Sequence, residues 1–156
     1  MKSSSASIPE LAETLGSLLR APYRLLQRRL YERLSVDFPE VRRSHSAVFR
    51  HLTPTGSRLT DLAEQAEMTK QSMAYLVGHL EEHGYVRTTG HPHDGRATLV
   101  KATAKGERFL AAALAASREA ESDAAARMGR SKLTQLRRLL EELAESLDDP
   151  RQRESS

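Results

Sequence analysis

Apolar residues return every three or four positions along the first part of the chain. Leucines occur at positions 11, 15, 18, 19, 25, 26, 30 and 34, which is the period of an amphipathic helix. The pattern predicts helical structure over residues 8–35. Pro22 lies inside this stretch, and because proline lacks a backbone N–H and crowds the preceding turn, we expect a kink or a break there.

The last third of the chain has a second helical pattern that is interrupted once. An alanine-rich stretch from Thr103 to Met128 predicts a long helix with Thr103 as its N-cap. Gly129 is expected to end it, and Ser131 to cap a final helix with leucines at 133, 136, 139, 140, 143 and 147. We therefore expect residues 104–147 to form two helices.

Residues 44–103 predict a small domain of short helices followed by strands. Ser44 is expected to cap a first short helix, which "TPTGS" ends. Thr60 is expected to cap the second helix and Thr69 the third, with Gly84 at the end of the third. The second and third helices follow one another so closely that only a tight turn can join them.

Two β-like runs, "YVRTTG" and "RATLVK", come after the third helix. Gly90, Pro92 and Gly95 lie between them, which is typical of a hairpin loop. Two helices joined by a tight turn and followed by a hairpin predict a winged helix-turn-helix. The expected fold class is thus mainly α with a small β-hairpin wing, and helices flank the winged domain at both ends.

The third helix has one apolar face and one polar face. Its apolar residues, spaced to share a buried side, are Met73, Leu76, Val77 and Leu80. The residues expected on or beside the exposed side, which suit base edges or phosphates, are Lys70, Gln71, Ser72, Tyr75 and His79. Ala74 and Gly78 keep that side slim enough to enter a major groove.

Composition excludes several classes of protein. Hydrophobic residues make up 38 % of the chain, and no apolar run is long enough to cross a bilayer. The polar start "MKSSSAS" lacks the apolar core of a signal peptide, so we expect a cytoplasmic protein with no membrane partner. The absence of cysteine excludes disulfides and thiolate chemistry. A length of 156 residues is expected to form one domain over residues 1–156.

The distribution of charge says more than its total. The net charge of +3 is only a weak indication of a polyanionic partner. Between Arg20 and Arg50, however, there are eight arginines against three acids, and between Met68 and Leu80 the only formal charge is Lys70. An acid-free segment suits a surface that approaches phosphates, although charge alone is equally compatible with an ordinary solvated face.

The stretch "HPHDGRATLV" gathers ionisable residues at the expected hairpin tip. His91, His93 and Asp94 raise the alternatives of a metal site or a catalytic His–Asp pair. A metal site needs three or four ligands with a supporting shell, and a catalytic pair needs a nucleophile, and we identify neither here. We interpret the stretch as a wing whose Arg96 reaches the negative potential of a minor groove.

The other histidines, at positions 45, 51, 79 and 83, are interpreted as surface or core residues that follow no ligand spacing. We therefore expect a protein with no bound metal, no cofactor and no enzymatic activity.

The segment "RLTDLAEQAEMTKQSMAYLVGHLEEHGYVRTTGHPHDGRATLVKATAKG" resembles the MarR family of bacterial transcription regulators. The markers are "LTDLAE", "MTKQSM", "LEEHGYV", the wing "HPHDGRA" and the closing "ATAKG". The family's wing usually reads Asp-Pro-x-Asp-Arg-Arg, which Pro92, Asp94 and Arg96 match. His91 and Gly95 depart from it, so the role of Arg96 carries over but a two-arginine wing does not.

The third helix departs from the family as well, since Ala74 and Tyr75 stand where Ser and Arg are frequent. Base preference therefore cannot be transferred.

The resemblance implies a homodimeric repressor that binds double-stranded DNA and is released by a small aromatic or amphipathic effector. Residues 8–35 and 104–147 would form the dimerisation helices and residues 44–103 the DNA reader. The implied DNA contacts are Thr69, Lys70, Gln71, Ser72, Tyr75, His79 and Arg96. The implied effector pocket is lined by Tyr23, His45, Phe49 and Arg87.

Two alternatives remain open from the sequence. One is an architectural DNA binder without sequence preference, for which all duplexes would bind alike. The other is a metal-dependent enzyme or metal sensor built on the histidines, for which purified protein would hold stoichiometric zinc.

Overall fold

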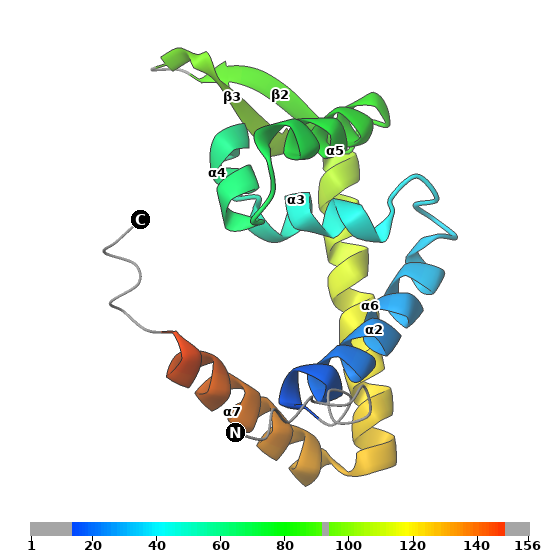
Figure 1. Cartoon of the computed structure of the whole chain (residues 1–156). Coiled ribbons are helices and arrows are strands. Elements are labelled where there is room, and N and C mark those ends of the chain that lie inside the picture. Colours follow the sequence, from blue (N-terminus) through cyan, green and yellow to red (C-terminus); the bar gives the residue numbers. More distant parts are fainter. Residues whose placement is uncertain (1–13, 92–93, 149–156) are drawn as a thin grey trace, which may run out of the picture. The chain divides into compact units, whose positions relative to one another are not determined.

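The computed structural model describes residues 14–91 and 94–148, and for residues 91 and 94–97 it describes the backbone alone. In chain order the elements are α2 (Leu15–Leu34), the 3-10 turn η1 (Arg43–His45), α3 (Ser46–His51), β1 (Ser57–Arg58), α4 (Leu59–Gln65), α5 (Lys70–Glu82), β2 (Val86–His91), β3 (Asp94–Ala102), α6 (Ala104–Met128) and α7 (Arg130–Leu147) (Figure 1). The chain forms two compact units, residues 1–117 and 118–156, which divide within α6. Within the described residues, no helix is long and apolar enough to cross a membrane.

The fold is mainly helical with a small antiparallel sheet, which confirms the expected class. The winged hairpin of β2 and β3 is present, with Val86 opposite Ala102 and Thr88 opposite Val100. A third strand was not anticipated: β1 pairs with β3 and gives the sheet the order β1-β3-β2. Its Ser57 is buried, accepts a hydrogen bond from the Thr53 N–H and donates one to the carbonyl of His51.

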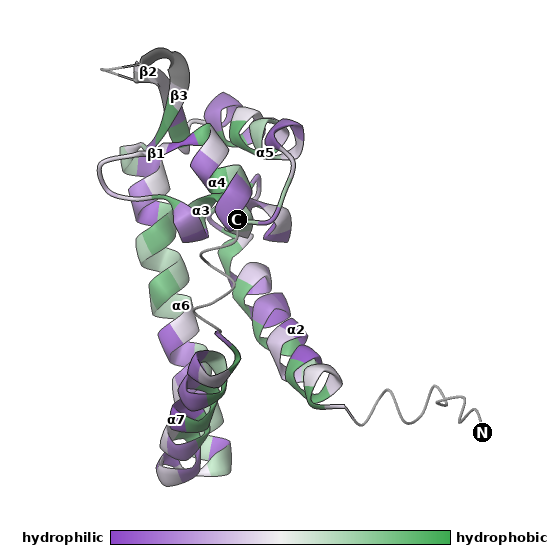
Figure 2. Ribbon diagram, turned by 60° about the vertical axis from the view of Figure 1, so that its left-hand side comes forward, coloured by the Kyte–Doolittle hydropathy of each residue, from purple (hydrophilic) through white to green (hydrophobic). Residues whose placement is uncertain are grey.

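Helix α2 is a single helix, so the expectation of a break at Pro22 is wrong. Proline leaves the carbonyl of Leu18 without its helical donor. Leu18 is exposed in this unit, however, and water can satisfy a carbonyl on an exposed helix surface. The side chains of Leu15, Leu18, Leu19, Leu25 and Leu26 are also exposed, and Figure 2 shows apolar positions along α2.

The core of the first unit is formed by residues from its helices and from its sheet. Its largest fully buried side chains are Leu62, Met73, Leu80, Val48, Tyr85, Val86 and Val100. Leu34 from the end of α2 and Phe109 from α6 belong to the same cluster. Truncating a buried leucine typically costs about 2–5 kcal/mol, so this core holds the helices and the sheet of the unit in fixed positions.

Several predicted helix starts are confirmed. The hydroxyl oxygen of Thr69 accepts from the Ser72 N–H, and that of Thr103 accepts from the Gly106 N–H. Gly84 follows α5 with a φ of +75°, the left-handed conformation that ends many helices.

Three other predicted caps are wrong. Ser44 lies inside the 3-10 turn, so α3 begins at Ser46. The N-cap of α4 is Arg58 and not Thr60, because β1 pairs with β3 and leads directly into the helix. The N-cap of α7 is Gly129 and not Ser131, since the positive φ of Gly129 reverses the chain one residue after α6.

Candidate nucleic-acid interface

The start of α5 is fixed by its own side chains. Besides accepting from the Ser72 N–H at 3.1 Å, the Thr69 hydroxyl donates to the hydroxyl of Ser72 at 2.8 Å. The turn before it is tight, because Glu67 adopts a φ of +52° and Met68 N–H donates to the carbonyl of Ala63. α4 and α5 therefore form the predicted helix-turn-helix.

One side of α5 is buried and the other is open. The predicted apolar residues Met73, Leu76, Val77 and Leu80 are all in the core. The exposed residues of its first three turns are Lys70, Gln71, Ser72, Ala74, Tyr75 and Gly78. Tyr75 is 77 % exposed, which is unusual for an aromatic side chain in a well-packed unit. The exposed side carries one cation and no acid until Glu81 and Glu82.

His79 is only partly exposed, at the edge of that open face, and its predicted contact with DNA stays a prediction. Its Nε2–H donates to the backbone carbonyl of Glu40 at 3.0 Å, and its ring stacks on His45 at 4.7 Å with 11° between the planes. On α5 this residue lies at the border between the open and the buried side. The contacts with the segment before η1 hold it inward.

The wing is tied to α5 by one carboxylate. Glu81 accepts from both the N–H and the hydroxyl of Thr88 on β2, at 2.6 and 2.7 Å. β2 is an edge strand, so this interaction satisfies a backbone donor at the rim of the sheet. No pattern in the sequence singles out Glu81, since only the fold brings it to Thr88.

The hairpin tip lies largely outside the described residues. Asp94 and Arg96 belong to β3, and His91 is paired with Asp94 in the strand register. The side chains of these residues, and all of His93, are outside the description. The role of Arg96 therefore stays a prediction.

The four residues predicted to line an effector pocket do not line one together. His45 and Phe49 are buried, with 3 % and 7 % of their surfaces exposed. Nδ1 of His45 accepts from the Arg42 N–H, and Phe49 packs on Phe109 in the core. Arg87 is exposed on the wing strand β2, and the cavity that Tyr23 lines includes none of the other three.

Burial keeps His45 uncharged. Desolvation, followed by the charges of His79 and Arg42, lowers its pKa to about 4. A neutral ring can stack on His79 without repulsion between two cations.

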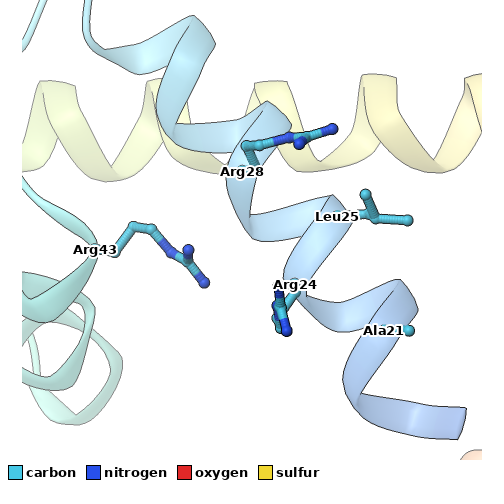
Figure 3. A pocket seen from close by; sticks show the side chains of 5 residues that line it. All are labelled: Ala21, Arg24, Leu25, Arg28 and Arg43. Carbon is cyan, nitrogen blue, oxygen red and sulfur yellow. The ribbon is translucent and has the colours of Figure 1, made fainter.

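Two open cavities lie between α2 and the η1–α3 segment. The first, of about 320 Å³, is lined by Ala21, Arg24, Leu25, Arg28 and Arg43. Figure 3 shows Arg43 extending from η1 toward α2, whose Arg24 lies across from it. The second, of about 490 Å³, includes Tyr23 and Arg50, whose guanidinium donates to the Tyr23 hydroxyl at 3.3 Å.

A polar contact in the same unit joins the segment before η1 to the end of α5. The Tyr85 hydroxyl donates to the Glu40 carboxylate at 2.7 Å, and Lys105 lies 3.8 Å from that carboxylate and 4.2 Å from the centre of the Tyr85 ring. The hydrogen bond from Tyr85 is the main cause that lowers the pKa of Glu40. This contact joins the segment before η1 to the residues that follow α5 and to the first turn of α6.

The comparisons with known proteins agree with this geometry. A family model described as "Winged helix DNA-binding domain" matches residues 41–106. The transcriptional regulator HosA of Escherichia coli O111:H- is 34 % identical over 79 residues, which cover 50 % of this chain and 58 % of that protein. The descriptions are of DNA-binding regulators, in line with the expectation that the chain is not an enzyme.

Solved structures share the fold over almost the whole chain. A MarR family transcriptional regulator from Rhodococcus sp. RHA1 matches with a TM-score of 0.68 and 22 % identity, covering 90 % of this chain and 96 % of that one. The transcriptional repressor CouR, solved bound to a 23-mer DNA duplex, matches with a TM-score of 0.67 and 21 % identity, covering 90 % and 99 %. Residues 41–106 therefore match a winged helix DNA-binding domain, and the chain has the fold of these solved regulators.

Proposed function

We propose that the chain is a transcription regulator that binds a pseudo-palindromic operator as a homodimer and represses until a small ligand releases it. The observation that carries the proposal is the open side of α5, a helix whose first three turns expose polar side chains and one cation but no acid. Such a face can approach DNA phosphates without repulsion and present hydrogen-bonding groups to base edges. The DNA-bound structure of the similar repressor CouR supports the choice of partner.

The proposed contacts divide by chemistry. Gln71 reads a base edge, because an amide can donate and accept at an adenine at the same time. Lys70 neutralises phosphate, and the exposed hydroxyls of Ser72 and Tyr75 contact backbone or bases. Thr69 contributes mainly by capping α5, so that the free N–H groups of its first turn face phosphate.

Arg96 is proposed to enter the minor groove from the wing, as the family resemblance suggests. The wing is held to α5 through Glu81 and Thr88, so a contact at its tip would be placed relative to the recognition helix.

The exposed leucines support the homodimer. Helix α2 exposes Leu15, Leu18, Leu19, Leu25 and Leu26, and α7 in the second unit exposes Leu136, Leu139, Leu140 and Leu147. Apolar surface of this extent is uncommon on a monomer and is typical of an interface. A two-fold dimer would place two α5 helices on half-sites about 10 base pairs apart, one turn of DNA.

The effector is proposed to bind beside α2, in the cavity lined by Arg24, Arg28 and Arg43 with Leu25 and Ala21. Three guanidinium groups next to apolar side chains suit an amphipathic anion such as an aromatic carboxylate. This replaces the predicted pocket of Tyr23, His45, Phe49 and Arg87. A DNA-bound role of this kind would place the protein in the cytoplasm.

The test begins with an operator selected from a random duplex library with the full-length chain. Gln71→Ala should change the preference at one position in each half-site by about 1–3 kcal/mol. Lys70→Ala should weaken all duplexes alike and flatten the dependence of affinity on salt. If the selection returned no preferred sequence, an architectural DNA binder would be the better description. Sedimentation of the same protein as a monomer at micromolar concentration would contradict the dimer.

The effector is tested on the selected operator with a panel of phenolic acids. Ligands of the proposed kind should weaken DNA binding about 5- to 150-fold, the usual range of coupling between two sites. Arg24→Ala should abolish that effect and leave the affinity for DNA without ligand unchanged. Acids that bind the protein but never shift its affinity for DNA would contradict the switch.

A further inference from the structure

We propose that His79, Glu82 and His83, at the C-terminal end of α5, form a binding site for Zn²⁺ or a similar transition-metal ion. The sequence here reads "HLEEH", which places the second histidine four residues and the glutamate three residues after the first. Positions three and four apart lie on one side of a helix. In this structure one ligand atom from each residue lies within 4.8 Å of the other two.

The earlier interpretation that the histidines follow no ligand spacing is therefore wrong for this pair. The spacing of two histidines at i and i+4 is a common way for one helix to supply two metal ligands.

Hydrogen bonds already orient both imidazole rings. His79 Nε2 lies 3.0 Å from the backbone carbonyl of Glu40, and His83 Nδ1 lies 2.9 Å from the backbone carbonyl of His79. A carbonyl can only accept, so both nitrogens carry the proton and donate. In each neutral ring the other nitrogen, Nδ1 of His79 and Nε2 of His83, then carries a lone pair. Metal-binding histidines in proteins are held in the same way, by a hydrogen bond from the nitrogen that does not bind the ion.

Small side-chain movements would complete the site. Metal–ligand distances of about 2.0–2.2 Å in a tetrahedral zinc site place neighbouring ligand atoms roughly 3.3–3.6 Å apart. One candidate ligand atom of each residue lies within 4.8 Å of the others, and Glu82 is exposed, so its carboxylate can turn toward the rings without disturbing the core. A water molecule would be the fourth ligand.

The neighbouring residues favour a cation and exclude a further histidine ligand. His45 stacks on His79, but its Nδ1 accepts from the Arg42 N–H and its side chain is buried, so it supports the ring without binding the ion. Lys105 donates to the carbonyl of His83 and lies 3.8 Å from the carboxylate of Glu40. The end of a helix also carries partial negative charge, which attracts a positive ion.

The ligand types select the class of metal. Two imidazole nitrogens and one carboxylate suit Zn²⁺, Co²⁺, Ni²⁺ or Cu²⁺, whereas Mg²⁺ and Ca²⁺ prefer sites made of oxygen. We take Zn²⁺ as the natural ion and Co²⁺ as its spectroscopic probe.

The experiment measures metal binding to the full-length chain without DNA, so its outcome is independent of the proposed function. Zn²⁺ affinity is determined by competition with a chromophoric chelator, and Co²⁺ is titrated while its visible absorption is recorded. We expect one Zn²⁺ per chain and the strong Co²⁺ bands of a four-coordinate site.

The variants are His83→Gln and Glu82→Gln; Glu82 is exposed, so its replacement is expected to leave the fold intact. Loss of a histidine ligand should weaken Zn²⁺ binding at least about 100-fold, since even supporting groups around a metal are worth 10- to 100-fold. Glu82→Gln should weaken it about tenfold and change the Co²⁺ spectrum. The matched control, His51→Gln, removes a histidine from α3 and should bind as the wild type does.

A double variant, His91→Ala with His93→Ala, distinguishes this site from a metal site in the wing. Unchanged Zn²⁺ binding in this variant supports the α5 site. Loss of binding there, with His83→Gln unaffected, would overturn the proposal, and so would a wild-type chain that binds no stoichiometric Zn²⁺.

Discussion

The carboxylate of Glu81, in the last turn of α5, accepts hydrogen bonds from both the N–H and the hydroxyl of Thr88 on the wing. These two bonds connect the candidate recognition helix to the edge strand of the sheet. Their loss would leave the fold complete but the wing less firmly held.

The coupling between the two residues is the first prediction. Thr88→Val and Glu81→Gln should each reduce the free energy of unfolding by about 0.5–1.5 kcal/mol, the net value of a typical hydrogen bond. The double variant should cost less than the sum of the two, because both changes remove the same interaction. Urea unfolding measures all three. Pairing Thr88→Val with Glu64→Gln, on α4, should give additive costs; additivity in both pairs would contradict the contact.

The second prediction concerns acid. The pKa of His45 is lowered from 6.5 to about 4 in the folded protein, so the unfolded chain binds a proton that the folded chain does not between these values. Stability should therefore fall as the pH drops below about 6.5, by at most on the order of 3 kcal/mol once pH 4 is reached. His45→Gln, which keeps an acceptor near the Arg42 N–H, should flatten the dependence.

The measurement is the urea midpoint between pH 7 and pH 5. This window lies above the range in which Glu40, with its lowered pKa, begins to take up a proton. Parallel curves for the wild type and the variant would show that another group is responsible.

Two glycines give opposite predictions. A Cβ on Gly106 would overlap the carbonyl oxygen of Tyr85, a backbone atom that cannot move aside, so Gly106→Ala should destabilise the protein by more than about 2 kcal/mol. A Cβ on Gly78 would meet nothing within 4 Å, so Gly78→Ala should stabilise α5 by about 0.5–1 kcal/mol. Thermal unfolding compares the two.

Gly78→Ala has a further consequence if α5 enters the major groove. The added methyl group lies on the exposed side of the helix, so operator affinity should fall although stability rises. Equal or better DNA binding by this variant would place the groove-facing surface elsewhere.

The wing gives the fourth prediction. Arg96→Ala should reduce operator affinity markedly, since each dimer loses two cations that remain charged at any working pH. The double variant His91→Ala and His93→Ala should lose far less, because the minor-groove contact is assigned to Arg96. A titration of both variants against one operator duplex decides between them, and the reverse order of effects would contradict the role of Arg96.

Elements were predictable where a local signal coincided with the apolar period. Thr69 and Thr103 cap their helices as expected, and Gly84 ends α5, because each acts on residues within one turn of itself. The order of these helix starts and ends along the chain was enough to predict the winged fold. The predicted cap at Thr60 was wrong because the start of α4 depends on a contact distant in sequence. Strand β1 pairs with residues more than 40 positions away, and that pairing sets where α4 begins.

Individual site residues were less predictable than the fold. Gln71 and Tyr75 are exposed as expected, but His79 lies at the border of the same helix face, where the period alone does not determine the direction of a side chain. Its contact with Glu40, 39 positions earlier, does. His45 and Phe49 were placed in a pocket by resemblance alone, whereas core packing buries them.

The first turn of α6 is joined to the residues that end α5 by several short contacts. The Thr103 hydroxyl donates to the carbonyl of Gly84 at 2.6 Å, its N–H donates to that of Tyr85, and Lys105 reaches the carbonyl of His83. With Gly106 packed directly on Tyr85, no side chain lies between the two backbones to absorb a displacement. A displacement of the first turn of α6 would therefore be passed directly to the residues that end α5.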